Sequence, residues 1–300
     1  MDEKEDLLSS ADPKSRNAWM RPYEDAIVGS STGDYGRLKL GGVAVDLCSP
    51  GQARARIESA LAVRERPGLL VGSVNLDHIH HFGPRTPSEH RAVGAGDGWL
   101  MTVDGAPISW AVRRATGIEQ PRICGSDFLP ELLTLAAESG HSVGFLGGTE
   151  EASTALSRVL AERYPDVDVR GHWTPPRSDL ESPRGSRALA DEIRDASVEL
   201  LVVGLGKPRQ ELWLQNYAER CGVSVALAFG ASTDFLAGMV RRAPAWAREH
   251  GMEWFYRLYL EPRRLARRYL VQGPRALGGV LIHPVERVRP EALVEPGVRF

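Results

Sequence analysis

The chain has 300 residues, of which 42% are hydrophobic and 25% are charged, so it contains enough apolar material for a sizeable core. Its formal net charge of -2 argues against a general nucleic-acid binder, which normally carries a strong basic excess. Three widely spaced cysteines, Cys48, Cys124 and Cys221, predict neither a disulfide framework nor a zinc site and favour a reducing cytoplasm.

Residues 1–38 are polar and have no sustained periodicity, which predicts a mobile leader. The acidic N-terminus does not resemble a signal peptide, and no run reaches the ~18 apolar residues that a membrane span requires. From residue 39 to residue 240, apolar runs alternate with amphipathic stretches. The runs predict strands at 42–48, 69–75, 99–103, 142–148, 167–173, from Leu200, and at 224–229. The stretches predict helices at 52–66, 87–93, 107–116, 127–139, 149–163, 184–196 and from Arg209.

Strands separated by helical patterns of this length are typical of βαβ units. The sequence therefore predicts an α/β fold, namely a Rossmann-like, mostly parallel sheet flanked by helices, with every strand before Val240.

Residues 241–300 have a different chemistry, which predicts an arginine-rich helical appendage and, from Pro284, a loose tail. Residues 241–270 hold eight arginines and three glutamates, an excess of five positive charges, with six aromatic side chains interleaved. Such a segment is either a solvated helical face that packs on the core or an interfacial helix that anionic lipid attracts. We favour the second interpretation.

The segment from Glu199 to Asn216 predicts a ligand-binding strand end. The apolar run 200–203 ends at Gly204 and Gly206, where the backbone can turn sharply, and Pro208 then suits the first turn of a helix. The free N–H groups of that helix would face the crevice where open α/β sheets bind ligands, so an anion is the expected guest. A strand, a glycine turn and a helix without any bound phosphate is the plainer alternative.

Polar residues also follow the other predicted strands and can meet at one edge of a parallel sheet. Together with their neighbours they form a series of short motifs in order. These are Ser73-Val-Asn75, Val103-Asp-Gly105, Arg122-Ile-Cys-Gly-Ser-Asp127, Phe145-Leu-Gly-Gly148, Tyr164-Pro-Asp with Gly171, Gly204-x-Gly-x-Pro-x-Gln-Glu211, Gly230-Ala-x-x-Asp-x-x-Ala-Gly238, Arg242-Ala-Pro-x-Trp246, Glu253-Trp254, Tyr256-Arg-Leu258 and Glu261-Pro-x-Arg264. From about Gly41 to Tyr269 the chain thus resembles the WecG/TagA/CpsF family of bacterial glycosyltransferases. It departs from the family pattern at Ser73, where threonine is usual, and in the histidine-rich stretch 77–81.

The resemblance implies a cytoplasmic, peripheral-membrane, metal-independent and inverting glycosyltransferase without a cofactor. It would move a hexosamine such as N-acetylmannosamine from a UDP-sugar to a polyprenyl-diphosphate-linked saccharide in cell-surface polysaccharide or teichoic acid-type biosynthesis. The transfer would take place at an anionic membrane surface, and the resemblance leaves open whether the protein is a monomer or a homo-oligomer. Relatives that transfer glucose or glucuronic acid leave the donor open. The rivals are a non-catalytic nucleotide-sugar-binding module and an NAD-dependent dehydrogenase, which the lack of G-x-G-x-x-G after the first strand disfavours.

The resemblance assigns the catalytic base to Asp104, whose carboxylate would take the proton of the attacking sugar hydroxyl. Capping the turn before the next helix is the alternative role for Asp104. The residues expected to bind substrate lie at or near the strand ends and are Ser73, Asn75, Arg122, Gly147, Gly148, Trp173, Gly206, Gln210, Glu211 and Asp234. In this set Trp173 would stack on a nucleobase and Asp234 would accept its imide N–H, although a core-rim aromatic and an N-cap explain them equally well.

The residues expected to contact the lipid or acceptor are Arg241, Arg242, Arg257, Arg263 and Arg264. No paired carboxylates of the D-x-D kind stand at a suitable strand end, so helix N-termini and arginines would meet the diphosphate charge and no metal site is expected. The histidines at 78, 80, 81 and 90 suggest a metal, but no further ligand pattern completes a set. Solvated loop histidines are the favoured interpretation.

Overall fold

A computed structural model describes residues 36–64, 68–244, 246–247, 251–283 and 285–288. The predicted leader lies outside the described residues except for residues 36–38, and most of the predicted tail after Pro284 lies outside them as well.

A six-stranded sheet forms the centre of the fold, and all of its neighbouring strands are parallel. Its order is β4-β3-β8-β7-β5-β6. The strands are β3 (Leu69–Val74), β4 (Trp99–Val103), β5 (Val143–Gly147), β6 (Val169–Trp173), β7 (Leu200–Gly204) and β8 (Val225–Leu227). These bounds confirm the predicted parallel core, and they bring the carboxyl ends of all six strands to one edge.

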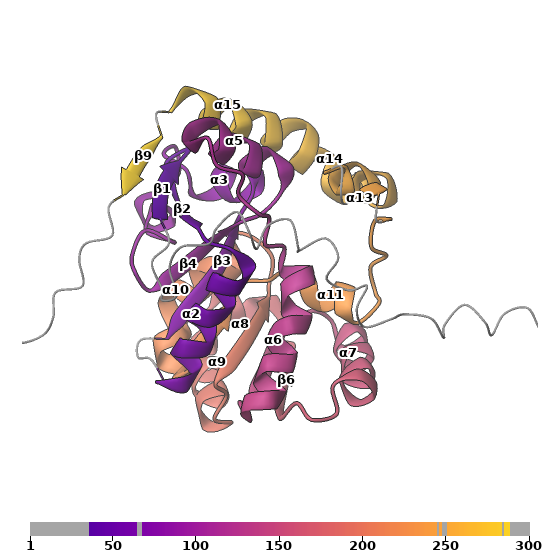
Figure 1. The fold of residues 1–300 in the computed structure, drawn as a ribbon. Coiled ribbons are helices and arrows are strands. Elements are labelled where there is room, and N and C mark those ends of the chain that lie inside the picture. Colours follow the sequence, from indigo (N-terminus) through magenta and orange to yellow (C-terminus); the bar gives the residue numbers. More distant parts are fainter. Residues whose placement is uncertain (1–35, 65–67, 245, 248–250, 284, 289–300) are drawn as a thin grey trace, which may run out of the picture. The chain divides into compact units, whose positions relative to one another are not determined.

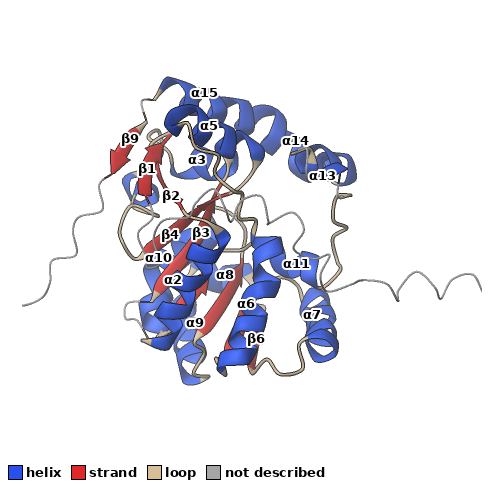
Figure 2. Cartoon of the chain, viewed as in Figure 1, coloured by secondary structure: helices blue, strands red, loops and turns tan. Residues whose placement is uncertain are grey.

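Helices cover both faces of this sheet (Figures 1 and 2). One buried cluster joins the sheet to α2 (Pro50–Ala62), α6 (Gly125–Ser139) and α7 (Glu150–Arg163). The other joins it to α5 (Ala106–Thr116), α9 (Pro183–Asp195) and α10 (Arg209–Cys221). Because both faces are covered, β7 can be apolar throughout, and Leu200 to Val203 are all fully buried.

A second sheet, of order β2-β1-β9, is antiparallel. It contains β1 (Gly36–Leu40), β2 (Val43–Leu47) and β9 (Glu286–Val288), with Gly41 and Gly42 at positive φ in the tight turn between β1 and β2. Two predictions are wrong here. The strand near Gly42 does not start the parallel sheet, because it pairs back on β1. Nor do all strands precede Val240, because β9 returns to pair with β1.

The C-terminal segment is helical, as predicted. It comprises α13 (Glu253–Leu260), α14 (Pro262–Ala266), the π-helical segment η3 (Arg267–Gln272) and α15 (Gly273–Ile282). Helix α15 packs on α3 (Leu76–Phe82), and Leu265, Ala276 and Val280 are buried. The remaining short helices are α4 (Ser88–Arg91), α8 (Arg177–Glu181) and α11 (Ser232–Leu236). Within the described ranges, no helix is long and apolar enough to cross a membrane.

Candidate active site

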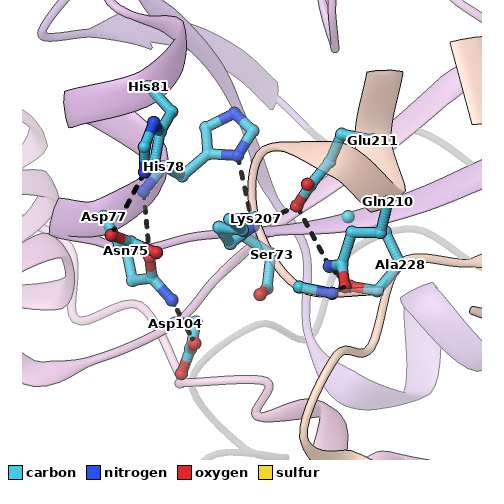
Figure 3. Close-up of polar contacts among 12 residues, drawn as sticks. Ser73, Asn75, Asp77, His78, His81, Asp104, Lys207, Gln210, Glu211 and Ala228 are labelled. Carbon is cyan, nitrogen blue, oxygen red and sulfur yellow. Dashed lines mark hydrogen bonds and ion pairs between the residues drawn. The ribbon is translucent and has the colours of Figure 1, made fainter. Parts of the chain in front are cut away.

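The Asp104 carboxylate stands where β4 ends, and both of its oxygens accept a hydrogen bond. Asn75, which follows β3, donates its Nδ2 to Asp104 Oδ2 at 3.0 Å (Figure 3). The Cys124 Sγ donates to Asp104 Oδ1 at 3.1 Å. Burial raises the pKa of the Cys124 thiol, and the negative charge of Asp104 raises it further, so the thiol keeps its proton and acts as a donor. The carboxylate is therefore held in a fixed orientation.

Backbone pairing explains how these three side chains meet. The Asp104 N–H donates to the Val74 carbonyl at 2.9 Å, which sets the end of β4 beside the end of β3. The Ile123 N–H donates to the Val103 carbonyl at 2.8 Å, which lays the chain before α6 along the same strand end and delivers Cys124. The side-chain oxygen of Asn75 caps α3 by accepting the His78 N–H at 3.0 Å, so its amide group is free to turn towards Asp104.

Helix α13 brings a further carboxyl group near Asp104. Burial raises the pKa of Glu253, and the next largest cause is the negative charge of Asp104. The residue Gly251, just before α13, packs closely against the start of α5, and this contact brings α13 near Asp104. Gly251 has a φ of +70°, and a Cβ there would lie 2.7 Å from the Ala106 Cβ and 3.8 Å from Arg122 Nη1. Arg122 and the start of α13 thus lie together beside the loop that carries Asp104.

Lys207, in the turn between β7 and α10, links this turn to the end of β3. Its side chain is only 8% exposed, and its ammonium group forms an ion pair with the fully buried carboxylate of Glu211. The same Nζ donates to the Ser73 carbonyl at 3.0 Å and lies 3.3 Å from His78 Nδ1 (Figure 3). We name these four residues, Ser73, His78, Lys207 and Glu211, the lysine cluster.

Gln210 supports the same turn from inside the protein. Its Oε1 accepts the Gly206 N–H at 3.1 Å, and its Nε2 donates to the Ala228 carbonyl at 2.8 Å and to Glu211 Oε1 at 3.1 Å. Only 1% of Gln210 is exposed. The two buried residues, Gln210 and Glu211, thus shape the backbone of the glycine turn, while Gly206, with a φ of +75°, has open space where a Cβ would point.

A pocket opens at the carboxyl ends of β5 and β6. Its lining includes the backbone turn Gly147–Gly148, Ser153 on α7, and Thr233 and Asp234 on α11. Gly147 has a φ of +108°, and a Cβ there would come within 2.5 Å of the Gly204 carbonyl oxygen, so only glycine fits this close approach between two strand ends. Burial raises the pKa of Asp234, and the charge of Arg264 acts in the opposite direction.

The arginines of the C-terminal segment fall into two groups. Arg242 pairs with Asp127 Oδ1 at 2.7 Å and donates to Ser126 Oγ at 3.1 Å, and Arg257 is half-buried. Arg241, Arg263 and Arg264 are exposed, and Arg264 forms an ion pair with Glu261. Exposed apolar side chains share this segment and include Trp254, Phe255, Tyr259, Leu260, Leu270 and Val271.

A family model described as "Glycosyl transferase WecG/TagA/CpsF family" matches residues 38–290. The chain belongs to this family. The match covers both sheets and the C-terminal helices, so the WecG/TagA/CpsF fold here includes the segment that the sequence alone set apart as an appendage.

Curated relatives carry the name N-acetylglucosaminyldiphosphoundecaprenol N-acetyl-beta-D-mannosaminyltransferase. The protein from Bacillus subtilis (strain 168) is 29% identical over 205 residues, which is 68% of this chain and 77% of that protein. The protein from Bacillus spizizenii (strain ATCC 23059 / NRRL B-14472 / W23) is 29% identical over 57% of this chain and 63% of its own length. The protein from Staphylococcus aureus (strain NCTC 8325 / PS 47) is 29% identical over 56% of this chain and 63% of its own length.

In this WecG/TagA/CpsF protein, the strand-end residues lie along one edge of the sheet, as predicted. They form separate groups along that edge. One group lies at the ends of β3 and β4 and consists of Ser73, Asn75 and Asp104. The other lines the pocket at β5 and β6, in the opposite half of the strand order, and includes Gly147, Gly148 and Asp234. Gly206 lies in the turn that follows β7, a strand between these two places. The binding roles of these residues remain predictions.

Trp173 does not line the pocket with Asp234. Its ring packs over Gly144 and Gly171, where an added Cβ would lie 2.9 Å and 2.6 Å from it, and it joins the core cluster on the other face of the sheet. The pocket is lined instead by the preceding residue, His172, which stacks on Phe145 with ring centroids 5.0 Å apart. Strand alternation, which places neighbouring residues on opposite faces, is the signal that pointed to His172.

The interpretation of the histidines as solvated loop residues is wrong: His80 and His81 lie in helix α3, His90 lies in α4, and none of the three is exposed. The clearest departure is His78. It lies in helix α3 and is fully buried, and burial and then the charge of Lys207 lower its pKa well below the usual range. His81, on the same helix, lies 3.7 Å from Asp77, which also forms an ion pair with Arg268 of η3 at 3.3 Å. Among the described residues, no group of three or more His, Cys, Asp or Glu side chains is arranged to hold a metal ion.

Proposed function

We propose that this protein transfers an N-acetylhexosamine from a UDP-sugar to a saccharide on a polyprenyl diphosphate. The observation that carries the proposal is the Asp104 carboxylate, held at both oxygens at the edge of the sheet where parallel α/β folds bind ligands. The names of the relatives, which describe transfer of N-acetylmannosamine to N-acetylglucosaminyl-diphosphoundecaprenol, supply the substrate class.

In the proposed reaction, one oxygen of the Asp104 carboxylate accepts the proton of the acceptor hydroxyl, while the oxygen of that hydroxyl attacks the anomeric carbon of the donor sugar. The bond between that carbon and the diphosphate oxygen breaks, and UDP leaves with the electron pair. A single displacement of this kind inverts the anomeric configuration. Asp104 suits the role because Asn75 and Cys124 fix its direction, while each carboxylate oxygen keeps a second lone pair for the hydroxyl proton.

The pocket at β5 and β6 is the proposed donor site. Its glycine backbone turn and the N-terminus of α7 offer N–H groups to a diphosphate, and the Asp234 carboxyl group can accept from a nucleobase. Release of UDP from a panel of UDP-sugars, each incubated with the lipid-linked acceptor, tests the assignment. Release from UDP-N-acetylmannosamine is expected, whereas release from UDP-glucose or UDP-glucuronic acid alone would assign a different donor.

Transfer is expected to continue in the presence of EDTA, because the proposal gives the diphosphate charge to Arg122 and backbone N–H groups rather than to a metal. Arg122→Ala is expected to weaken donor use, seen as a raised KM for the UDP-sugar. The matched control is Arg170→Ala, an exposed arginine that pairs with Asp168. Loss of activity in EDTA with recovery on addition of Mg²⁺ or Mn²⁺ would contradict this assignment.

We also propose that the exposed arginines and apolar side chains of α13 to η3 rest on an anionic membrane surface. The protein is expected to bind vesicles of phosphatidylglycerol and phosphatidylcholine and to leave them as salt rises, because screening weakens the attraction. The double substitution Arg263→Ser with Arg267→Ser should reduce this binding about 30-fold, at about one kcal/mol for each arginine near the surface.

Substitution, not truncation, is the right test of the membrane role, because α15 and β9 are part of the packed fold. Arg158→Ser with Arg163→Ser, on the distant helix α7, is the matched control. Equal binding to neutral and anionic vesicles at low salt would show that these charges do not direct the protein to membranes.

A further inference from the structure

The Phe235 ring of α11 lies against two arginines from the C-terminal segment. The Arg257 Cζ is 5.2 Å from the ring centroid, and the Arg242 Cζ is 5.8 Å from it. Both distances are within the ~6 Å over which a cation is attracted to the face of an aromatic ring. Phe235 directly follows Asp234, which lines the pocket, so one short helix carries both a pocket wall and the contact for the arginines.

The guanidinium groups need this contact because they are only partly satisfied by hydrogen bonds. The Nε atoms of Arg242 and Arg257 are buried and have no hydrogen-bond partner in the described part of the chain. Arg242 is held at its other end by Asp127 and Ser126. No such ion pair within 4.0 Å is found for Arg257 among the described residues, so the ring face is the contact that fixes its position.

The charge of Arg257 reaches the pocket. Burial raises the pKa of Asp234, and the positive charges of Arg264 and Arg257 oppose this rise. Arg257 and Arg242 also lower the pKa of Glu253, which senses the charge of Asp104. Arg257 therefore acts electrostatically on Asp234 in the pocket and on Glu253 near Asp104, and Arg242 acts on Glu253.

We propose that Phe235 is a positioning residue, whose ring holds the guanidinium groups of Arg257 and Arg242 between the pocket and the Asp104 carboxylate. This inference rests on the proposed function, because Arg242 and Arg257 are expected to contact the lipid-linked acceptor of that transfer. The ring acts through its negative face, which substitution by an aliphatic side chain of similar size removes. Neither the spacing of the motifs nor the charge pattern of the sequence identifies Phe235 as a residue of the site.

The test compares aromatic and aliphatic replacements at one position. Phe235→Tyr keeps the ring and is expected to retain kcat/KM for the lipid acceptor within about threefold, whereas Phe235→Leu is expected to lower it about tenfold. The dissociation constant for UDP should change little in either variant, because Asp234 and the glycine turn remain. Incorporation of mono-, di- and trifluorophenylalanine at position 235 should lower kcat/KM stepwise, since fluorine withdraws charge from the ring face while its shape is nearly kept.

Trp110→Leu is the matched control. Trp110 also lies under an arginine, with the Arg114 Cζ 5.9 Å from its ring, but on the exposed side of α5, so its loss should leave the kinetics unchanged. The proposal is wrong, and the ring acts only by packing, if Phe235→Leu retains the wild-type kcat/KM and Phe235→Tyr does not. The same holds if kcat/KM does not change across the fluorinated series.

Failure of the proposed function would be seen separately. If the wild-type protein binds UDP but transfers no sugar to lipid, the transferase assignment fails. The coupling between Phe235→Leu and Arg257→Met in a double-mutant cycle of unfolding free energy would then still test the contact, and an absent coupling would refute it.

Discussion

Replacing Asp104 with asparagine is expected to lower turnover with the lipid-linked acceptor by roughly 10²-fold or more, because a positioned general base contributes about that factor. The amide has nearly the size of the carboxylate but cannot take the proton of the attacking hydroxyl. It also leaves one oxygen for two donors, Asn75 Nδ2 and Cys124 Sγ. The loss should therefore appear in kcat, with UDP binding near that of the wild-type protein.

Two control variants distinguish loss of the base from loss of a neighbouring contact or of any carboxylate. Cys124→Ser keeps a donor to Asp104 and should retain most of the activity, and Asp195→Asn, at an exposed carboxylate, should have no effect. If Asp104→Asn turns over the true acceptor at close to the wild-type rate, Asp104 caps the turn before α5 and another group is the base.

Replacing Lys207 with methionine is expected to destabilise the protein by about 3–5 kcal/mol, since it leaves the Glu211 charge buried without its partner. The side chain of Glu211 is fully buried, and its Oε2 already has no hydrogen-bond partner among the described residues. The variant also removes the donor to the Ser73 carbonyl. Urea unfolding followed by circular dichroism measures the change in free energy.

A matched ion pair exists on the surface. Arg177 and Glu181 are also four residues apart on a helix, but their side chains are 72% and 56% exposed, so Arg177→Met should leave stability near that of the wild-type protein. Adding Glu211→Gln to Lys207→Met should restore part of the loss, because the buried charge is then gone. Equal, small effects of Lys207→Met and Arg177→Met would show that the lysine cluster is not a buried ionic contact.

Local patterns in the sequence predicted most of the parallel core. The run from Leu200 to Val203 reads as a buried strand because both sheet faces are covered, and the glycines that follow it mark the turn. Strand β1 was missed because only five residues alternate, with Leu38 and Leu40 buried next to a polar stretch that hides the pattern. Helix α3 was missed because its histidines look like loop residues. Asn75 followed by Asp77 was the capping signal that indicated a helix start.

The site was predictable to the extent that it follows the strand ends. Asp104 and Asn75 could be expected to meet because parallel strands end at one edge, and the hydrogen bond between them confirms that they do. Lys207 and Ser73 lie 134 positions apart, and no local pattern encodes the contact between them. The same holds for Phe235 and Arg257, whose contact depends on how α13 folds back on α11.

The mass of the lipid product tests the proposed transfer most directly. The purified protein is incubated with UDP-N-acetylmannosamine and undecaprenyl-diphosphate-N-acetylglucosamine, and the extracted lipid is analysed by mass spectrometry beside a reaction with Asp104→Asn. We expect the lipid to gain the mass of one N-acetylhexosamine with the wild-type protein, and we expect this product to be nearly absent with the variant. A lipid of unchanged mass with every UDP-sugar in the panel, from a protein that binds UDP, would contradict the proposed transfer.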